Sequence, residues 1–143
     1  MQKVRVKVKL LHEDAKMPVY KTGEAAAMDI YSIEDKVIEP GKYEIIGTGL
    51  SMEIEPGYCW QFWTRSGHGA KGVQHFAGLL DSDYRGEFKV ILFNSTPEPF
   101  KIEKGDRIIQ VVPVPIARAD LELVDELSES ERGEGRFHST GMK

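Results

Sequence analysis

The sequence predicts an all-β domain of the jelly-roll or β-sandwich class, built from many short strands and followed by a flexible C-terminal arm. Short runs rich in β-branched and aromatic residues recur at roughly regular spacing and are separated by turn signals. No window shows a convincing 3.6-residue period, and only residues 25–29 and 65–72 could hold a helical turn. The 143 residues suffice for one domain with its own core.

The first predicted strand covers residues 3–11, where apolar residues alternate with lysine and arginine. This period of two is typical of a half-buried strand. The tripeptide Glu-Pro-Gly then occurs at 39–41 and again at 55–57, each time between β-branched or aromatic runs. Pro followed by Gly suits the central positions of a type II turn, because Gly adopts positive φ at little cost. Such repeated turns favour an antiparallel meander or sandwich.

Four more strands are predicted at residues 58–63, 88–94, 106–116 and 119–127. Pro113 and Pro115 lie two apart in the third of these. Because proline has no N–H to donate, these two positions should not face a central ladder partner. We therefore expect a jelly-roll domain over residues 1–127 and a flexible arm over residues 128–143.

Composition excludes several classes of protein. The net charge of −4 argues against a nucleic-acid binder, which usually carries a basic patch on a basic domain. Cys59 is the only cysteine, so neither an intrachain disulfide nor a Cys-rich metal site can form. A free thiol is compatible with a reducing compartment. The chain has no apolar run of transmembrane length and no signal-peptide core, so we expect a soluble, cytoplasmic or otherwise intracellular protein without a membrane partner.

Three short motifs each allow a structural and a functional interpretation. TRSGHGAKG (64–72) is either a surface loop or a phosphate cradle, in which Arg65 supplies charge and Ser66 and Gly67 supply donors. Gln110 lies in an apolar strand, where its amide either faces solvent or orients a water or a phosphate oxygen. Asp29 follows three alanines and reads as a cap or turn carboxylate, or as an acid beside a closely approaching segment.

The segment GLLDSDYRGE (78–87) places two acids and a tyrosine at one turn. Asp81 follows two leucines, and an unpaired aspartate is ionised at neutral pH, so it could accept a proton from water. Asp83 and Arg85 are better explained as turn and ion-pair residues. Tyr84 could be an ordinary aromatic packed on the sheet.

The last stretch, SESERGEGRFHSTGMK (128–143), is rich in Gly, Ser and charge, which is typical of a disordered tail. Phe137 is a lone large aromatic among arginines and hydroxyl residues. That cluster would suit an arm closing over a phosphorylated ligand, with Arg and hydroxyls for the phosphates and an aromatic for a base.

Together, five motifs appear in the order found in the trimeric deoxyuridine triphosphate nucleotidohydrolase (dUTPase) family, which the chain resembles from about residue 22 onward. They are EAAAMDIYS (24–32), TRSGHGAKG (64–72), GLLDSDYRGE (78–87), GDRIIQ (105–110) and RGEGRFHSTG (132–141). The third motif is highly specific, and the five together make chance similarity implausible.

The resemblance implies a β jelly roll that forms a homotrimer, with each active site drawing on all three subunits. It implies hydrolysis of dUTP to dUMP and pyrophosphate, which supplies dUMP and keeps uracil out of DNA. Mg²⁺ is expected to be held mainly by the triphosphate, with Asp29 contacting it through water. Asp81 would activate the attacking water, and Gln110 would hold that water in line with the α-phosphorus.

The same resemblance assigns the substrate contacts. Tyr84 would lie under the deoxyribose and leave no room for a 2′-hydroxyl. Phe137 would stack on the uracil. The remaining expected contacts are the base-reading hairpin at His75, Gly78, Leu79 and Leu80, the positions Arg65, Ser66, Gly67 and Lys89, and the arm residues Arg132, Ser139 and Thr140, which would bind phosphates.

The chain departs from the family pattern at several positions. Thr64 and His68 stand where the family usually has Pro and Leu, and the short interval between Arg65 and Asp81 predicts a trimmed base-reading hairpin. In the arm, Arg136 and His138 replace glycines. If either position needs positive φ, the larger side chain has a steric cost there. Alternatively, Arg136 adds a phosphate contact. The alternatives are a dCTP deaminase, a bifunctional deaminase–diphosphatase of the same fold, and a non-catalytic β-sandwich interaction module.

Overall fold

The computed structural model describes residues 1–137 and 140–141 and confirms the all-β prediction. The elements are β1 (Val6–Leu10), β2 (Met28–Tyr31), β3 (Lys36–Ile38), β4 (Tyr43–Gly47), β5 (Leu50–Ile54), β6 (Tyr58–Trp63), α1 (Ser66–Lys71), β7 (Val73–Phe76), β8 (Leu79–Leu80), β9 (Lys89–Asn94), β10 (Phe100–Ile102) and β11 (Arg107–Pro115). In the described part of the chain, no helix reaches the length and hydropathy that crossing a membrane requires.

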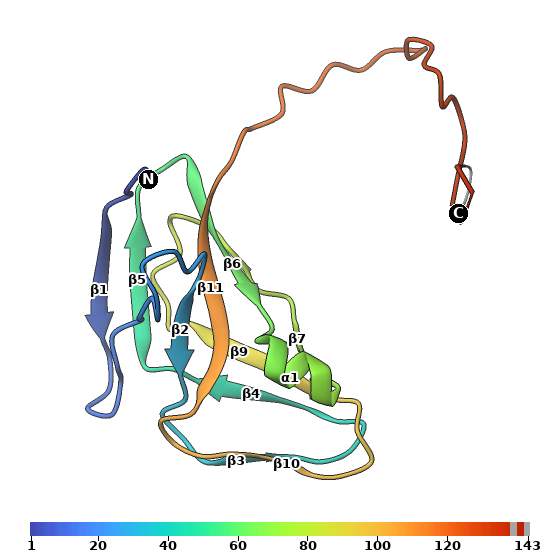
Figure 1. Ribbon diagram of the computed structural model, residues 1–143. Coiled ribbons are helices and arrows are strands. Elements are labelled where there is room, and N and C mark those ends of the chain that lie inside the picture. Colours follow the sequence, from blue (N-terminus) through green and yellow to red (C-terminus); the bar gives the residue numbers. More distant parts are fainter. Residues whose placement is uncertain (138–139, 142–143) are drawn as a thin grey trace.

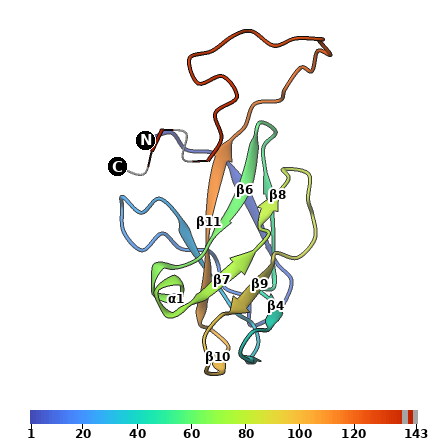
Figure 2. The same cartoon turned by 90° about the vertical axis from the view of Figure 1, so that its right-hand side faces the viewer.

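The strands form antiparallel sheets arranged as a sandwich. One sheet has the order β2-β11-β6-β8, another has the order β4-β9-β7, and the ribbons β1-β5 and β10-β3 complete the layers. Figure 1 shows the long strand β11 running through the middle of the domain, with β1 and β5 to one side and β3 and β10 across its base. Figure 2 shows β11, β6 and β8 side by side and α1 at the edge of the domain.

The core contains apolar side chains from both main sheets. Trp60 and Phe62 on β6 meet Phe88 edge to face, with ring centroids 6.0 and 5.9 Å apart. Trp60 and Phe88 are fully buried. Aromatic pairs of this geometry contribute roughly 0.5–1.5 kcal/mol beyond the burial of their area. The aromatic cluster therefore fixes β6, the strand that carries the residues before α1.

The turn and proline predictions are confirmed. Gly41 and Gly57, the last residues of the two Glu-Pro-Gly turns, have φ of 72° and 96°. The pairing of β11 with β2 ends at Val111, whereas its pairing with β6 continues to Pro115. Ile116 donates to the Gly57 carbonyl on the β6 side, so by the alternation of a strand the proline nitrogens face the open edge beyond β2.

The predicted strand at 119–127 is wrong for the chain as described. The last strand ends at Pro115, and every described residue from there onward is exposed. Leu121, Leu123 and Leu127 are almost fully exposed. Their apolar pattern can become a strand only against a sheet edge that supplies hydrogen bonds, and the segment leaves the domain instead, arcing away from the top of β11 (Figure 1).

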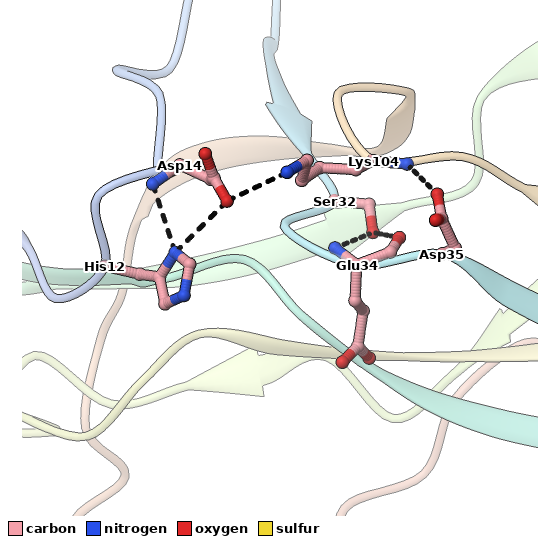
Figure 3. A network of polar contacts seen from close by, with 6 residues as sticks. All are labelled: His12, Asp14, Ser32, Glu34, Asp35 and Lys104. Atoms are coloured by element: carbon pink, nitrogen blue, oxygen red, sulfur yellow. Dashed lines mark hydrogen bonds and ion pairs between the residues drawn. The ribbon is translucent and has the colours of Figure 1, made fainter.

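The turn that leads into β11 is held by contacts from two other loops (Figure 3). The Lys104 amide donates to Asp35 Oδ1 at 2.8 Å, and the Lys104 ammonium lies 3.1 Å from Asp14 Oδ2. The Asp14 amide in turn donates to His12 Nδ1 at 3.1 Å. These contacts anchor the start of β11, where Arg107 begins the strand.

Candidate active site

Asp29 is the centre of a charged group at the junction of β2, β11 and the segment after β6. Its Oδ1 lies 3.4 Å from Nε of Arg65, and its Oδ2 lies 3.2 Å from Nη1 of Arg107. Arg65 also donates through Nη1 to the Arg107 carbonyl at 3.3 Å. Asp29 is buried in a strand, so the cap or turn interpretation does not apply. One buried carboxylate thus orients two guanidinium groups.

Gln110 lies on the same sheet face as this group. In the register of β11, Gln110 is opposite Asp29 on one side and Trp63 on the other. Directly opposed residues of antiparallel strands project from the same face, so these three side chains share one surface. Trp63 is exposed and Gln110 is half-buried. This face therefore presents an amide beside the charged group.

The start of α1 offers backbone donors next to Arg65. The amides of His68 and Gly69 donate to the Arg65 carbonyl, while those of Ser66 and Gly67 have no acceptor in the described part of the chain. A Cβ added at Gly67 would meet no atom within 4 Å. The first amides of a helix lack partners within the helix, so this open space can receive an oxyanion.

Asp81 and Tyr84 lie in the turn that follows β8. The Tyr84 amide donates to the Asp81 carbonyl at 3.1 Å, and the Asp81 side chain is exposed. The Tyr84 hydroxyl donates to the Glu87 carbonyl at 2.8 Å, and a Cβ at Gly86 would lie 2.5 Å from that hydroxyl. The turn therefore holds the hydroxyl end of the tyrosine ring against Gly86, and Asp81 is exposed in the same turn. Arg85 pairs with Glu53 at 3.7 Å.

The structure does not bring Asp81 and Gln110 of one chain together. Trp63 is opposite Gln110, whereas Trp60, three positions earlier on β6, is opposite Leu80. At about 3.3 Å per residue and about 4.8 Å per strand, Leu80 and Gln110 lie roughly 14 Å apart across β6. Asp81 lies one residue further along, too far for two side chains to share one water.

The strands of the predicted base-reading hairpin do not pair with each other, because β7 pairs with β9 and β8 pairs with β6. The Thr64 hydroxyl accepts the His75 amide at 3.0 Å and lies 2.7 Å from His75 Nδ1. Burial lowers the pKa of His75, an effect that the Phe62 carbonyl opposes. At the tip, Ala77 and Gly78 have φ of 57° and 105°. These two residues with positive φ make the tight connection by which the chain passes from the β4-β9-β7 sheet to the β2-β11-β6-β8 sheet.

The other predicted contacts are spread over the chain. Leu79 is exposed and Leu80 half-buried on β8, and Lys89 is exposed at the start of β9 in the other main sheet. In the arm, Arg132 donates to the carbonyls of Gly135 and Arg136. Phe137 is 96% exposed, and Thr140 is also exposed. Ser139 and His138 lie outside the described residues.

Asp29 is the acidic side chain of the charged group that could contact a metal ion. Among the described residues, no group of three His, Cys, Asp or Glu side chains could hold a metal ion. Mg²⁺ commonly keeps several waters and binds through one or two carboxylates together with substrate phosphates. Asp29 fits such an indirect role, because two arginines leave part of the capacity of its two oxygens unused.

Two residues at the site were not predicted from the sequence. Arg107 was expected only to begin a strand, yet it shares Asp29 with Arg65. Its place within the GDRIIQ motif was the available signal. Thr64 was noted only as a departure from proline, yet its hydroxyl ties the hairpin to β6. A proline at that position could make neither hydrogen bond.

Comparison with known proteins identifies the family to which the chain belongs. The dUTPase family model matches residues 13–141. The deoxyuridine 5′-triphosphate nucleotidohydrolase of Nautilia profundicola is 49% identical over 142 residues, covering 96% of this chain and 99% of that protein. The Clostridium tetani protein of the same name is 44% identical and covers 99% of both chains.

Solved structures agree with this match. The Staphylococcus bacteriophage 80alpha dUTPase with dUPNHPP has a TM-score of 0.90 and 31% identity, covering 96% of this chain and 98% of that one. A dUTPase from phage phi11 of S. aureus, studied for the coordination of a structural Mg(II) ion, has a TM-score of 0.82 and 26% identity over 87% of this chain and 99% of that one. The chain, with its five motifs in place along this fold, belongs to the dUTPase family.

Proposed function

We propose that this dUTPase hydrolyses dUTP to dUMP and pyrophosphate by in-line attack of water on the α-phosphorus. The main support is the arrangement on one sheet face, where Arg65 and Arg107 are oriented by Asp29 beside the open amides of Ser66 and Gly67. Such a cradle suits phosphate oxygens. The family match over residues 13–141 supports the substrate.

Asp81 is the proposed general base. It takes a proton from water as the water oxygen forms a bond to the α-phosphorus, and the bond to the bridging oxygen breaks so that pyrophosphate leaves with the electron pair. Gln110 is proposed to hold the water in line through its amide. The exposed position of Asp81 beside a fixed tyrosine supports this role.

Mg²⁺ is proposed to bind the triphosphate, with Asp29 contacting it through water. When bound, the ion supplies charge neutralisation on the phosphate oxygens. Asp29 has a second task that needs no metal, because it holds both arginines toward the cradle. A protein with net charge −4 can in this way accept a polyanion at one local positive site.

A homotrimer with shared sites is proposed because one chain cannot complete the site. Asp81 and Gln110 are separated across β6, so they must come from different copies to meet at one substrate. Leu121 and Leu123 are exposed, and an apolar groove of about 830 Å³ beside β1 could receive such a segment from another copy. Apolar surface of this kind is typical of an interface.

The arm, residues 128–143, is proposed to close over a site formed by other copies. Phe137 would stack on the uracil, and Arg132, Ser139 and Thr140 would bind phosphates. The almost complete exposure of Phe137 supports a partner outside its own domain. Tyr84 is proposed to lie under the deoxyribose, and the hairpin from His75 to Leu80 is proposed to read the uracil edge, with Lys89 as a further contact.

The test is a panel of dUTP, dCTP, dTTP and UTP with Mg²⁺, followed by release of pyrophosphate and ammonia. We expect pyrophosphate from dUTP alone. Ammonia from dCTP would favour a deaminase, and absence of all turnover would favour an interaction module. Asp81→Asn should lower kcat at least about 100-fold and still bind dUTP, whereas Asp83→Asn serves as the matched control and should stay near wild type.

Assembly and the arm are tested separately. Sedimentation should give about three times the 16.1 kDa chain mass. A chain ending at residue 131 should remain trimeric and lose most of its turnover. A truncated chain that dissociates or melts would instead assign the arm a structural role, and a full-length monomer with undiminished turnover would contradict the shared site.

A further inference from the structure

A cationic pocket separate from the cradle lies between α1, β10 and the start of β11, with Arg65 in its lining. Its volume is about 320 Å³. Its lining residues are Arg65, His68, Lys71, Phe100, Lys101, Ile102, Asp106, Arg107 and Ile108. Four of these carry permanent positive charge and one carries negative charge. The pocket is therefore a strongly positive spot on a chain whose net charge is −4.

The charged side chains that line this pocket differ in whether they already have an ion-pair or hydrogen-bond partner. Arg65 and Arg107 share the single carboxylate of Asp29. Lys71 and Lys101 form no ion pair within the described part of the chain and are exposed. The one acid of the lining, Asp106, already accepts a backbone amide at 2.8 Å through Oδ2. Two ammonium groups therefore remain for a ligand.

His68 reports the electrostatic potential of the pocket. Its ring meets Phe100 edge to face at 5.3 Å, and its Nδ1 is buried without a hydrogen-bond partner among the described residues. Burial lowers the pKa of His68, and Arg65 and Lys71 lower it further, while Asp106 opposes them. Lys101 and Arg107 line the same pocket from β10 and β11. Burial is thus the main cause of the lowered pKa of His68, and two cations add to it against one acid and the Ile108 backbone.

We propose that this pocket binds an inorganic oxyanion of the phosphate class, and specifically the pyrophosphate that the proposed reaction releases. Lys71 and Lys101 supply the free charges, and Phe100 and Ile102 supply the apolar part of the lining. Arg65 borders both the cradle and the pocket. The released pyrophosphate can thus remain bound to the enzyme after dUTP has been hydrolysed.

The identity of the ligand rests on the proposed function, but its binding can be measured without turnover. Calorimetry with pyrophosphate in Mg²⁺-free buffer should give a saturable site on the full chain, with inorganic phosphate binding more weakly and chloride not at all. A Lys71→Glu/Lys101→Glu variant should raise the Kd at least about tenfold. The control Lys9→Glu/Lys42→Glu makes the same change in net charge at two exposed positions that do not line the pocket, and it should change the Kd less than threefold, roughly.

Two results would overturn the inference. One is pyrophosphate binding that is absent, or that is weakened equally by both double variants. The other is a KM for dUTP that rises in parallel with the Kd for pyrophosphate in Lys71→Glu/Lys101→Glu, because the pocket would then hold the phosphates of the substrate itself. If dUTP is not hydrolysed at all, the proposed function is wrong, but calorimetry still shows whether pyrophosphate binds in this pocket. If Lys71→Glu/Lys101→Glu does not fold, Lys71→Gln/Lys101→Gln provides the same comparison.

His68 supplies an independent readout. A bound anion should raise the pKa of His68, as followed by NMR titration, in the wild type and not in Lys71→Glu/Lys101→Glu. Because the protonated ring attracts an anion, pyrophosphate should bind more tightly as the pH falls, and His68→Leu should remove that part of the pH dependence. An unchanged pKa at saturating pyrophosphate would place the anion elsewhere.

Discussion

Replacing Asp29 by Asn should destabilise the fold and disorder the phosphate cradle together. The Asp29 side chain is 10% exposed, and those of Arg65 and Arg107 are 24% and 41% exposed. Removing one partner of a buried ion pair costs about 3–5 kcal/mol, because a charge is left without compensation. Since Arg107 is partly hydrated and its pair is screened, we expect the low end, about 3 kcal/mol. For a chain of this length that corresponds to a fall in Tm of roughly 10 °C.

The assay is denaturant unfolding at fixed protein concentration, because assembly shifts apparent stability by mass action. The matched control is Asp14→Asn, which breaks the exposed pair between Asp14 and Lys104 at 3.1 Å (Figure 3). Exposed pairs contribute about 0–1 kcal/mol, so this variant should stay close to wild type. Equal loss in the two variants, or less than about 1 kcal/mol in Asp29→Asn, would refute the view that Asp29 is a buried anchor for two arginines.

Two further predictions concern the hairpin and the histidines. Gly78→Ala should lower the free energy of unfolding by about 1–3 kcal/mol, because φ of Gly78 is 105° and the new Cβ would lie 2.7 Å from Phe62 Cβ. Thermal melting measures this loss. The control is Gly67→Ala, where the new Cβ has open space and the stability should not change. The pKa values of His68 and His75 are lowered in the fold, so below about 6.5 the unfolded chain binds more protons than the native one. Stability should therefore fall as pH drops through that window, and a flat profile between pH 8 and 5.5 would contradict this.

The fold class was predictable because its signals are local. Alternation, Glu-Pro-Gly turns and paired prolines each depend on a few neighbouring residues, and the structure confirms them. The segment 119–127 shows the limit of such signals. Its apolar residues satisfy a strand pattern, but a strand also needs an edge to pair with, and the described chain leaves it none. A periodic pattern predicts which face of a strand is buried, but it does not predict which other element covers that face.

The site was predictable only in part, because its geometry depends on sheet register. Asp29 and Gln110 become neighbours only through the pairing of β2 with β11, which includes an irregularity between Arg107 and Ile109. Shifting a register by one residue would turn every side chain to the other face. Local reasoning therefore left Asp29 as a cap or an acid beside another segment, and gave Arg107 no role at the site.

The separation of the two halves of the site also bears on how activity would depend on assembly. On the single chain the cradle lies at one end of β6 and Asp81 lies toward the other, with the exposed side chains of Trp63 and Leu79 on the sheet face between them. Covering that apolar face with another copy would gain about 25 cal/mol for each Å² removed from water. In the proposed trimer the contact that buries Trp63 and Leu79 is thus the contact that can bring Asp81 of one copy to Gln110 of another. Activity and assembly should therefore be lost together in Trp63→Glu, and the cradle itself should persist in each separated chain, because Asp29, Arg65 and Arg107 all belong to one copy.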